Sequence, residues 1–168
     1  MMHYNLRVEQ WIPIPLERTF AFFANPNNLP RITPPELSLK LERLKIVPAD
    51  PSHPSFAAAG SEVEVSFRVP LLGFHMTHVA HITGFEMNRS FRDQHSRWPL
   101  MDWDHRHEFE SSTRDGIVGT IVRDDLRYAL GPGILGTIPN VLVVRHQLQK
   151  MFAFRHYSLD QLVAAGSL

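Results

Sequence analysis

Hydrophobic and polar residues alternate along several segments of this chain, which is the pattern of strands with one buried face. The alternation is clearest at residues 62–69, where hydrophobic side chains occupy every second position. Between Leu41 and Leu44 the alternation slips, which predicts a bulge or a bend. The segments that read as strands are 4–12, 38–47, 63–69, 74–85, 89–97, 101–111 and 116–130.

Two regions have helical spacing instead. Apolar residues recur with this spacing over residues 16–24, directly after Pro15, which suits the first turn of a helix. The Asn25-Pro26 pair predicts the end of that helix, because the residue before a proline is pushed out of the helical conformation. A short second helix is expected in the proline-rich segment 27–37.

A long C-terminal helix is predicted over residues 139–165, after a segment rich in glycine and proline. Its apolar residues form one broad stripe: Val141, Val144, Leu148, Met151, Phe152, Leu159, Leu162 and Val163. A curved antiparallel sheet and this helix would bury their apolar faces against each other and leave a cavity between them. We therefore expect a single α+β domain spanning residues 1–168.

Five segments in this order resemble a known superfamily. They are "TFAFF" at 19–23, "NPNNLPRITPPEL" at 25–37, "WDHRHEFE" at 103–110, "GTIVRDDLRYALG" at 119–131 and "MFAFRH" at 151–156. The chain resembles the START-like (SRPBCC) superfamily, and more narrowly its bacterial polyketide cyclase/dehydrase-type members. This resemblance implies a helix-grip fold: a seven-stranded antiparallel sheet wrapped around the C-terminal helix, with two short helices after the first strand. It also implies binding of a hydrophobic or amphipathic small molecule, without implying one chemistry.

Composition narrows the function classes. The 17 Lys and Arg residues equal the 17 Asp and Glu residues, which argues against nucleic acid as a partner. The chain has no cysteine, so disulfides and thiolate chemistry are excluded. It has neither the apolar run of a signal peptide nor a stretch long enough for membrane insertion, so we expect a cytoplasmic protein. No cofactor is expected.

Ten histidines are the compositional anomaly, and two of them lie in the stretch "WDHRHEF" at 103–109. In a strand, His105 and His107 share a face with Trp103 and Phe109. The same alternation turns several ionisable side chains toward the interior, and one more comes from the C-terminal helix. The inward polar set is Asp93, His95, His105, His107, Asp124 and Arg155.

Three interpretations of this set stay open. The groups form a structural network, because buried charges need partners; Arg155 would then pair with Asp124. Alternatively, they anchor the polar end of a ligand. In the third interpretation, His105 or His107 acts as a general base that Asp124 orients, as in a cyclase or dehydratase.

A metal site is the least favoured interpretation. His105 and His107 with Asp124 or Asp93 offer a donor set, but an isolated His-x-His pattern is a weak signal. The sequence prediction therefore includes no metal. Most of the other histidines are interpreted as surface or rim residues: His75, His78, His81, His146 and His156.

The expected ligand site has apolar walls and a few polar contacts. Tyr128 either bonds the ligand or caps the sheet, and Trp98 and Trp103 either pack at the rim or line the mouth. The glycine-rich loop at 131–136 is either a connector or a gate. A protein-interaction module without a ligand is a further alternative. The expected ligand-contacting residues are Phe67, Phe91, Trp103, His105, His107, Phe109, Val122, Asp124, Tyr128, Leu148, Phe152 and Arg155, with Val63 and Val65 as further wall residues.

Overall fold

The computed structural model describes residues 3–68, 75–97, 100–130 and 138–168. Its strands are β1 His3–Ile12, β2 Lys40–Lys45, β3 Glu62–Arg68, β4 His75–Glu86, β5 Ser90–Arg97, β6 Leu100–Arg114 and β7 Ile117–Leu130. Its α-helices are α1 Leu16–Ala24 and α2 Ile138–Ala164, and two short 3-10 helices cover Pro26–Ile32 and Pro35–Leu37.

All seven strands form one antiparallel sheet in the order β1-β7-β6-β5-β4-β3-β2. The first strand therefore pairs with the last one, and the remaining strands follow as a meander. The register of β2 against β3 shifts between Leu41 and Arg43, which confirms the bulge that the slipped alternation predicts. The α+β architecture expected from the sequence is confirmed.

Prolines shape the segment after α1. The helix ends at Ala24, and Asn25 before Pro26 has extended backbone angles, as predicted. The second helix, however, is two short 3-10 helices rather than one α-helix. Proline lacks an N–H donor, so a segment with four prolines cannot sustain the α-helical ladder.

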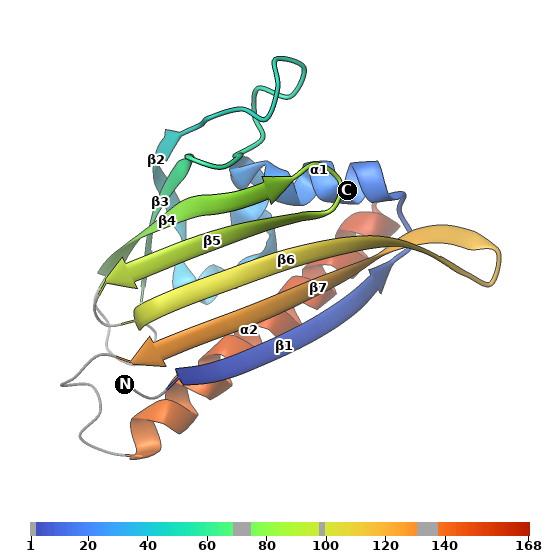
Figure 1. The fold of residues 1–168 in the computed structure, drawn as a ribbon. Coiled ribbons are helices and arrows are strands. Elements are labelled where there is room, and N and C mark those ends of the chain that lie inside the picture. The colour runs from blue at the N-terminus through green and yellow to red at the C-terminus, as the bar shows by residue number, and fades with distance from the viewer. Residues whose placement is uncertain (1–2, 69–74, 98–99, 131–137) are drawn as a thin grey trace.

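Helix α2 lies across one face of the sheet, which is called the inner face below (Figure 1). Gln10 of β1 fixes it to the sheet edge, because its Nε2 donates to the carbonyl of His156 at 3.1 Å and to Asp160 Oδ1 at 2.8 Å. Helix α1 covers the same face further toward β4 (Figure 1). In the part of the chain that the structure describes, no helix is both long and apolar enough to cross a membrane.

The core under α1 is aromatic. Phe20 is fully buried and packs edge-on against Phe85, Phe91 and Phe109, with ring centroids 5.4, 6.3 and 5.2 Å apart. Edge-to-face packing suits the charge distribution of aromatic rings and stabilises the pair beyond area burial. Helix α1 thus packs on the inner face beside α2, over the aromatic residues of β4, β5 and β6.

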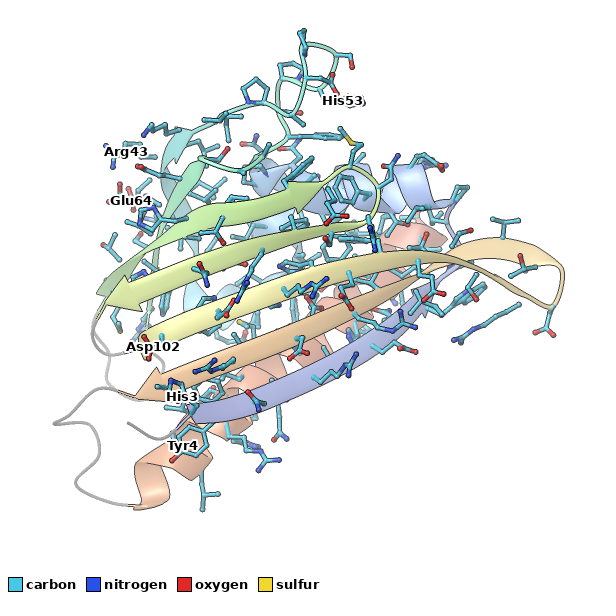
Figure 2. All side chains as sticks on the ribbon, in the orientation of Figure 1. His3, Tyr4, Arg43, His53, Glu64 and Asp102 are labelled. Carbon is cyan, nitrogen blue, oxygen red and sulfur yellow. The ribbon has the colours of Figure 1, made fainter. Side chains whose placement is uncertain are left out.

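The opposite face of the sheet carries charged side chains in cross-strand pairs (Figure 2). Arg43 Nε lies 3.1 Å from Glu64 Oε2 on the neighbouring strand, and His3 Nε2 lies 3.1 Å from Asp102 Oδ2. Such exposed pairs stabilise little, at about 0–1 kcal/mol each. Their value here is to mark this face as the solvent-facing one.

Candidate functional site

Strand pairing brings the ionisable residues of the inner face together. Asp93 of β5 lies directly opposite His105 of β6, and His107 lies directly opposite Asp124 of β7. Opposite residues on antiparallel strands have Cβ atoms about 5 Å apart, so their side chains meet. The alternation of β6 places both histidines on the face that α2 covers, and both are buried as predicted.

One oxygen of Asp124 contacts both imidazoles. Its Oδ1 accepts a hydrogen bond from His105 Nε2 at 3.0 Å. His107 Nδ1 lies 2.6 Å from the same oxygen, although that approach lacks the alignment of a hydrogen bond. The sequence hypothesis that Asp124 orients an imidazole is therefore supported for His105, and His107 adds a close electrostatic contact.

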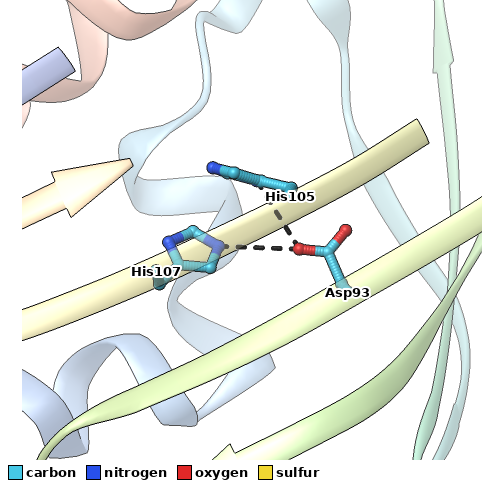
Figure 3. Close-up of side chains that lie close together, drawn as sticks. All are labelled: Asp93, His105 and His107. Carbon is cyan, nitrogen blue, oxygen red and sulfur yellow. Dashed lines mark ion pairs between the residues drawn. The ribbon is translucent and has the colours of Figure 1, made fainter. Parts of the chain in front are cut away.

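Asp93 faces the other side of the two rings (Figure 3). Its Oδ2 lies 3.5 Å from His105 Nδ1 and 3.6 Å from His107 Nε2. Both separations exceed the usual hydrogen-bond range of about 2.7–3.2 Å. The other carboxylate oxygen accepts a hydrogen bond from Trp103 Nε1 at 3.0 Å, so the indole holds Asp93 in place.

Arg155 connects α2 to this cluster. Its guanidinium donates to Asp124 Oδ1 at 3.4 Å, which confirms the predicted pairing. The same guanidinium lies over the Phe152 ring, 4.9 Å from the centroid. Its Nε is buried and has no hydrogen-bond partner. A buried donor without an acceptor is costly, so this atom is a point at which a ligand oxygen would stabilise the protein.

The two carboxyl groups are ionised. Burial alone would raise the pKa of Asp124, but the electrostatic effect of His107, the hydrogen bond with His105 and the Arg155 charge hold it well below its ordinary value. Burial likewise opposes ionisation of Asp93, and its histidine neighbours still lower that pKa to about 2. Two negative charges therefore face the imidazoles from opposite sides.

The pKa values of the two histidines shift in opposite directions. Burial and the neighbouring charge of His107 lower the pKa of His105, and the carboxylates only partly offset them. For His107 burial also acts to lower the pKa, but Asp124 and Asp93 outweigh it and the pKa is raised. The arrangement thus combines a less basic imidazole with a more basic one, and both lie between the two carboxylates.

Aromatic rings enclose the histidines. Phe91 stacks on His107 with ring centroids 4.2 Å apart, and Phe152 meets His105 edge-on at 5.6 Å. Phe23 of α1 lies 6.2 Å from His107. Sequence reasoning misses Phe23 as a neighbour of the site, because helical spacing predicts an apolar face without saying which strand it covers.

His78 lies further inside the protein than the surface or rim position that the sequence predicts. It is half-buried, and its ring lies 3.9 Å from that of His95. The His95 ring is itself held by a hydrogen bond of 2.9 Å between Nδ1 and the Val79 carbonyl oxygen. Burial and the neighbouring His95 lower the pKa of His78 to about 4. The alternation along β4 indicates the burial of His78, since its position has the opposite parity to those of the exposed His75 and His81.

The predicted apolar walls are divided among three packed clusters. Phe91, Phe109 and Val122 join the core around Phe20. Tyr128, Leu148 and Phe152 pack with Leu126. Phe67 packs with Val63 and Val65 in a third cluster on the far half of the sheet, so the structure does not bring it to the histidines. Trp98 and the glycine-rich loop at 131–136 lie outside the described residues.

A hollow of about 520 Å³ lies on a different part of the molecule from the one expected. Most of its lining residues belong to the solvent-facing side of β4–β7, and it also reaches His95 and Trp103. The lining residues are His81, Thr83, Gln94, His95, Asp102, Trp103, Asp104 and Arg127. The enclosed cavity between sheet and α2 stays a prediction.

Comparison with known proteins identifies the fold. No family model matches the chain, and no curated protein matches it in sequence. A START superfamily protein from Mycobacterium smegmatis is similar in structure, with a TM-score of 0.63 at 12% identity over 96% of this chain and 99% of that one. The protein TTHA0849 from Thermus thermophilus gives 0.62 at 19% identity over 98% and 100% of the two chains.

A third solved structure, Ara h 8.0201, has a TM-score of 0.58 at 14% identity over 95% of this chain and 99% of its own. Identities this low establish the shared fold alone. The element order and the antiparallel sheet with its long C-terminal helix agree with it across the chain. The polypeptide therefore has the START-like helix-grip fold.

Proposed function

We propose that this protein binds a small amphipathic molecule at the inner face of its sheet, under α2. The ligand's polar end would meet Arg155 and the histidines, and its apolar part would lie against Phe152, Phe91 and neighbouring rings. The observation that carries the proposal is the buried Arg155 Nε without a partner, in a guanidinium that also pairs with Asp124. A protein does not retain such a group at low cost unless something else satisfies it.

The chemistry favours an anionic or carbonyl polar group. Arg155 offers a free N–H donor, and guanidinium groups bind carboxylate and related oxyanions well. The aromatic rings nearby suit a flat or chain-like hydrocarbon part.

A titration with anilinonaphthalene sulfonate tests this proposal, because the probe combines an aromatic body with an anionic group. We expect saturable binding at one site per chain, weakened about tenfold in Arg155→Met, as for loss of one charged hydrogen bond. Arg145→Met is the matched control, since Arg145 is exposed on the same helix. Equal affinity of both variants, with circular dichroism showing intact folds, would refute the role of Arg155.

A second candidate function is acid–base catalysis of the cyclase or dehydratase type. One observation favours it: His105 is buried, has a lowered pKa and is held by Asp124 at 3.0 Å. A neutral, oriented imidazole is a usable general base. Incubation with linear poly-β-keto thioesters, followed by mass spectrometry for loss of water, tests it. Absence of turnover in wild type argues against catalysis, and unchanged turnover in His105→Gln argues against His105 as the base.

A further inference from the structure

The side of the imidazoles that faces Asp93 has a different geometry from the side that faces Asp124. On the Asp124 side the contacts are 3.0 and 2.6 Å long. On the Asp93 side the contacts are 3.5 and 3.6 Å long, and both run from the same carboxylate oxygen to a nitrogen of each ring (Figure 3). The three atoms Asp93 Oδ2, His105 Nδ1 and His107 Nε2 all lie within 4.8 Å of one another.

These separations fit a shared cation. Ligand atoms bonded at about 2.1 Å in a tetrahedral arrangement lie roughly 3.4 Å apart. The separations of Asp93 Oδ2 from the two nitrogens, 3.5 and 3.6 Å, are close to that value. Two imidazoles and one carboxylate are a donor set suited to zinc and similar divalent ions, and they leave a coordination position open.

The histidine ligands of metal sites are usually held by a second group on their other ring nitrogen, and Asp124 lies in that position here. Its Oδ1 meets His105 Nε2 and approaches His107 Nδ1, which are the nitrogens pointing away from Asp93. A carboxylate on the far nitrogen fixes the tautomer, so that the near nitrogen presents its lone pair, and increases its basicity. Arg155 and Trp103 in turn hold the two carboxylates. The arrangement therefore has ligands and outer partners in the positions that a histidine-carboxylate metal site requires.

We propose that Asp93, His105 and His107 bind one zinc-class divalent ion, with Asp124 orienting both histidines. The proposal goes beyond amphiphile binding and does not depend on it. Both involve the histidines, but they differ in the group that decides them, since the metal needs Asp93 whereas the amphiphile needs Arg155.

Titration of the full chain with Co²⁺ tests the proposal, because its visible absorption reports the coordination of the ion directly. We expect one Co²⁺ per chain, a d–d spectrum of low coordination number, and displacement by Zn²⁺. Asp93→Asn and His107→Gln should each weaken binding more than about 100-fold, and Asp124→Asn about 10- to 100-fold. The control His146→Gln, at an exposed position on α2, should bind as wild type does.

The wild-type protein gives an independent readout in case a variant fails to fold. Bound Co²⁺ is paramagnetic, so the imidazole NMR signals of His105 and His107 should shift or broaden before those of the exposed His75 and His146. Absence of one-to-one binding overturns the proposal. Binding that persists in folded Asp93→Asn and His107→Gln, or that perturbs other histidines first, also overturns it.

Discussion

Asp124 Oδ1 and His105 Nε2 lie 3.0 Å apart in the buried centre of the inner face, joined by a hydrogen bond from β6 to β7. The ionised carboxylate has no proton, so the hydrogen must be on His105 Nε2. The same oxygen accepts from Arg155 of α2. Asp124 is consequently the anion through which two strands and the long helix are held together.

Replacing this anion should destabilise the protein strongly. Asp124→Asn keeps the shape of the side chain but leaves the buried Arg155 guanidinium without its anionic partner. Loss of one partner from a buried charge pair costs about 3–5 kcal/mol. Urea unfolding at neutral pH measures the effect. Asp125→Asn, at the adjacent exposed position, is the control and should change stability by less than about 0.5 kcal/mol; similar losses in both variants would contradict the role of Asp124.

His78 should make the protein sensitive to mild acid. Its pKa falls from 6.5 to about 4 on folding, so the unfolded chain binds the proton more readily than the folded one between these values. Stability is therefore lost as the pH falls from about 6.5 toward 4, by on the order of 3 kcal/mol from this residue. His78→Gln removes that contribution.

Urea unfolding of both proteins at several pH values from 7 to 4.5 checks this prediction. The wild-type protein should lose stability more steeply than His78→Gln over that range. The exposed His81 provides the matched control, and His81→Gln should retain the wild-type slope. Parallel curves for wild type and His78→Gln would show that His78 is not held neutral by burial.

Phe20 should be among the most sensitive apolar positions. It is fully buried and contacts the rings of Phe56, Phe85, Phe91 and Phe109. Phe20→Ala removes the centre of this cluster and should cost about 3–5 kcal/mol. Ile117→Ala at the exposed β6–β7 turn is the control and should cost far less. A small loss of stability for Phe20→Ala in urea unfolding would contradict this prediction, because it would show that neighbouring side chains move into the vacated space.

Gly119 marks a close approach between β7 and β1. A Cβ added there would lie 2.5 Å from the Ile12 carbonyl oxygen and 2.7 Å from the Trp11 ring. Gly119→Ala should therefore displace the end of β1 and destabilise the protein by about 1–3 kcal/mol. Amide hydrogen exchange should show faster exchange at the paired end of β1 than in wild type. Unchanged exchange there would contradict the predicted clash.

The sequence predicts the fold and the inner polar set through the same alternation. The alternation of inward and outward positions in β5, β6 and β7 predicts four inward ionisable residues, and the structure brings them into one cluster: Asp93, His105, His107 and Asp124. Periodicity does not predict which elements pack together at long range. The sequence prediction therefore groups Phe67 with the histidines although it packs with Val63, and it misses the proximity of Phe23 to His107. The separations on the Asp93 side, which motivate the metal proposal, depend on side-chain positions that no sequence pattern specifies.

Native mass spectrometry of the protein as purified from cells tests the central claim, that the inner face binds a small amphipathic molecule. We expect an added mass at one copy per chain, lost on denaturation and recovered as an organic compound by extraction. Arg155→Met should lose this mass, whereas Arg145→Met should keep it. A chain that carries no such molecule, and whose melting temperature no member of an amphiphile panel raises, would contradict the claim.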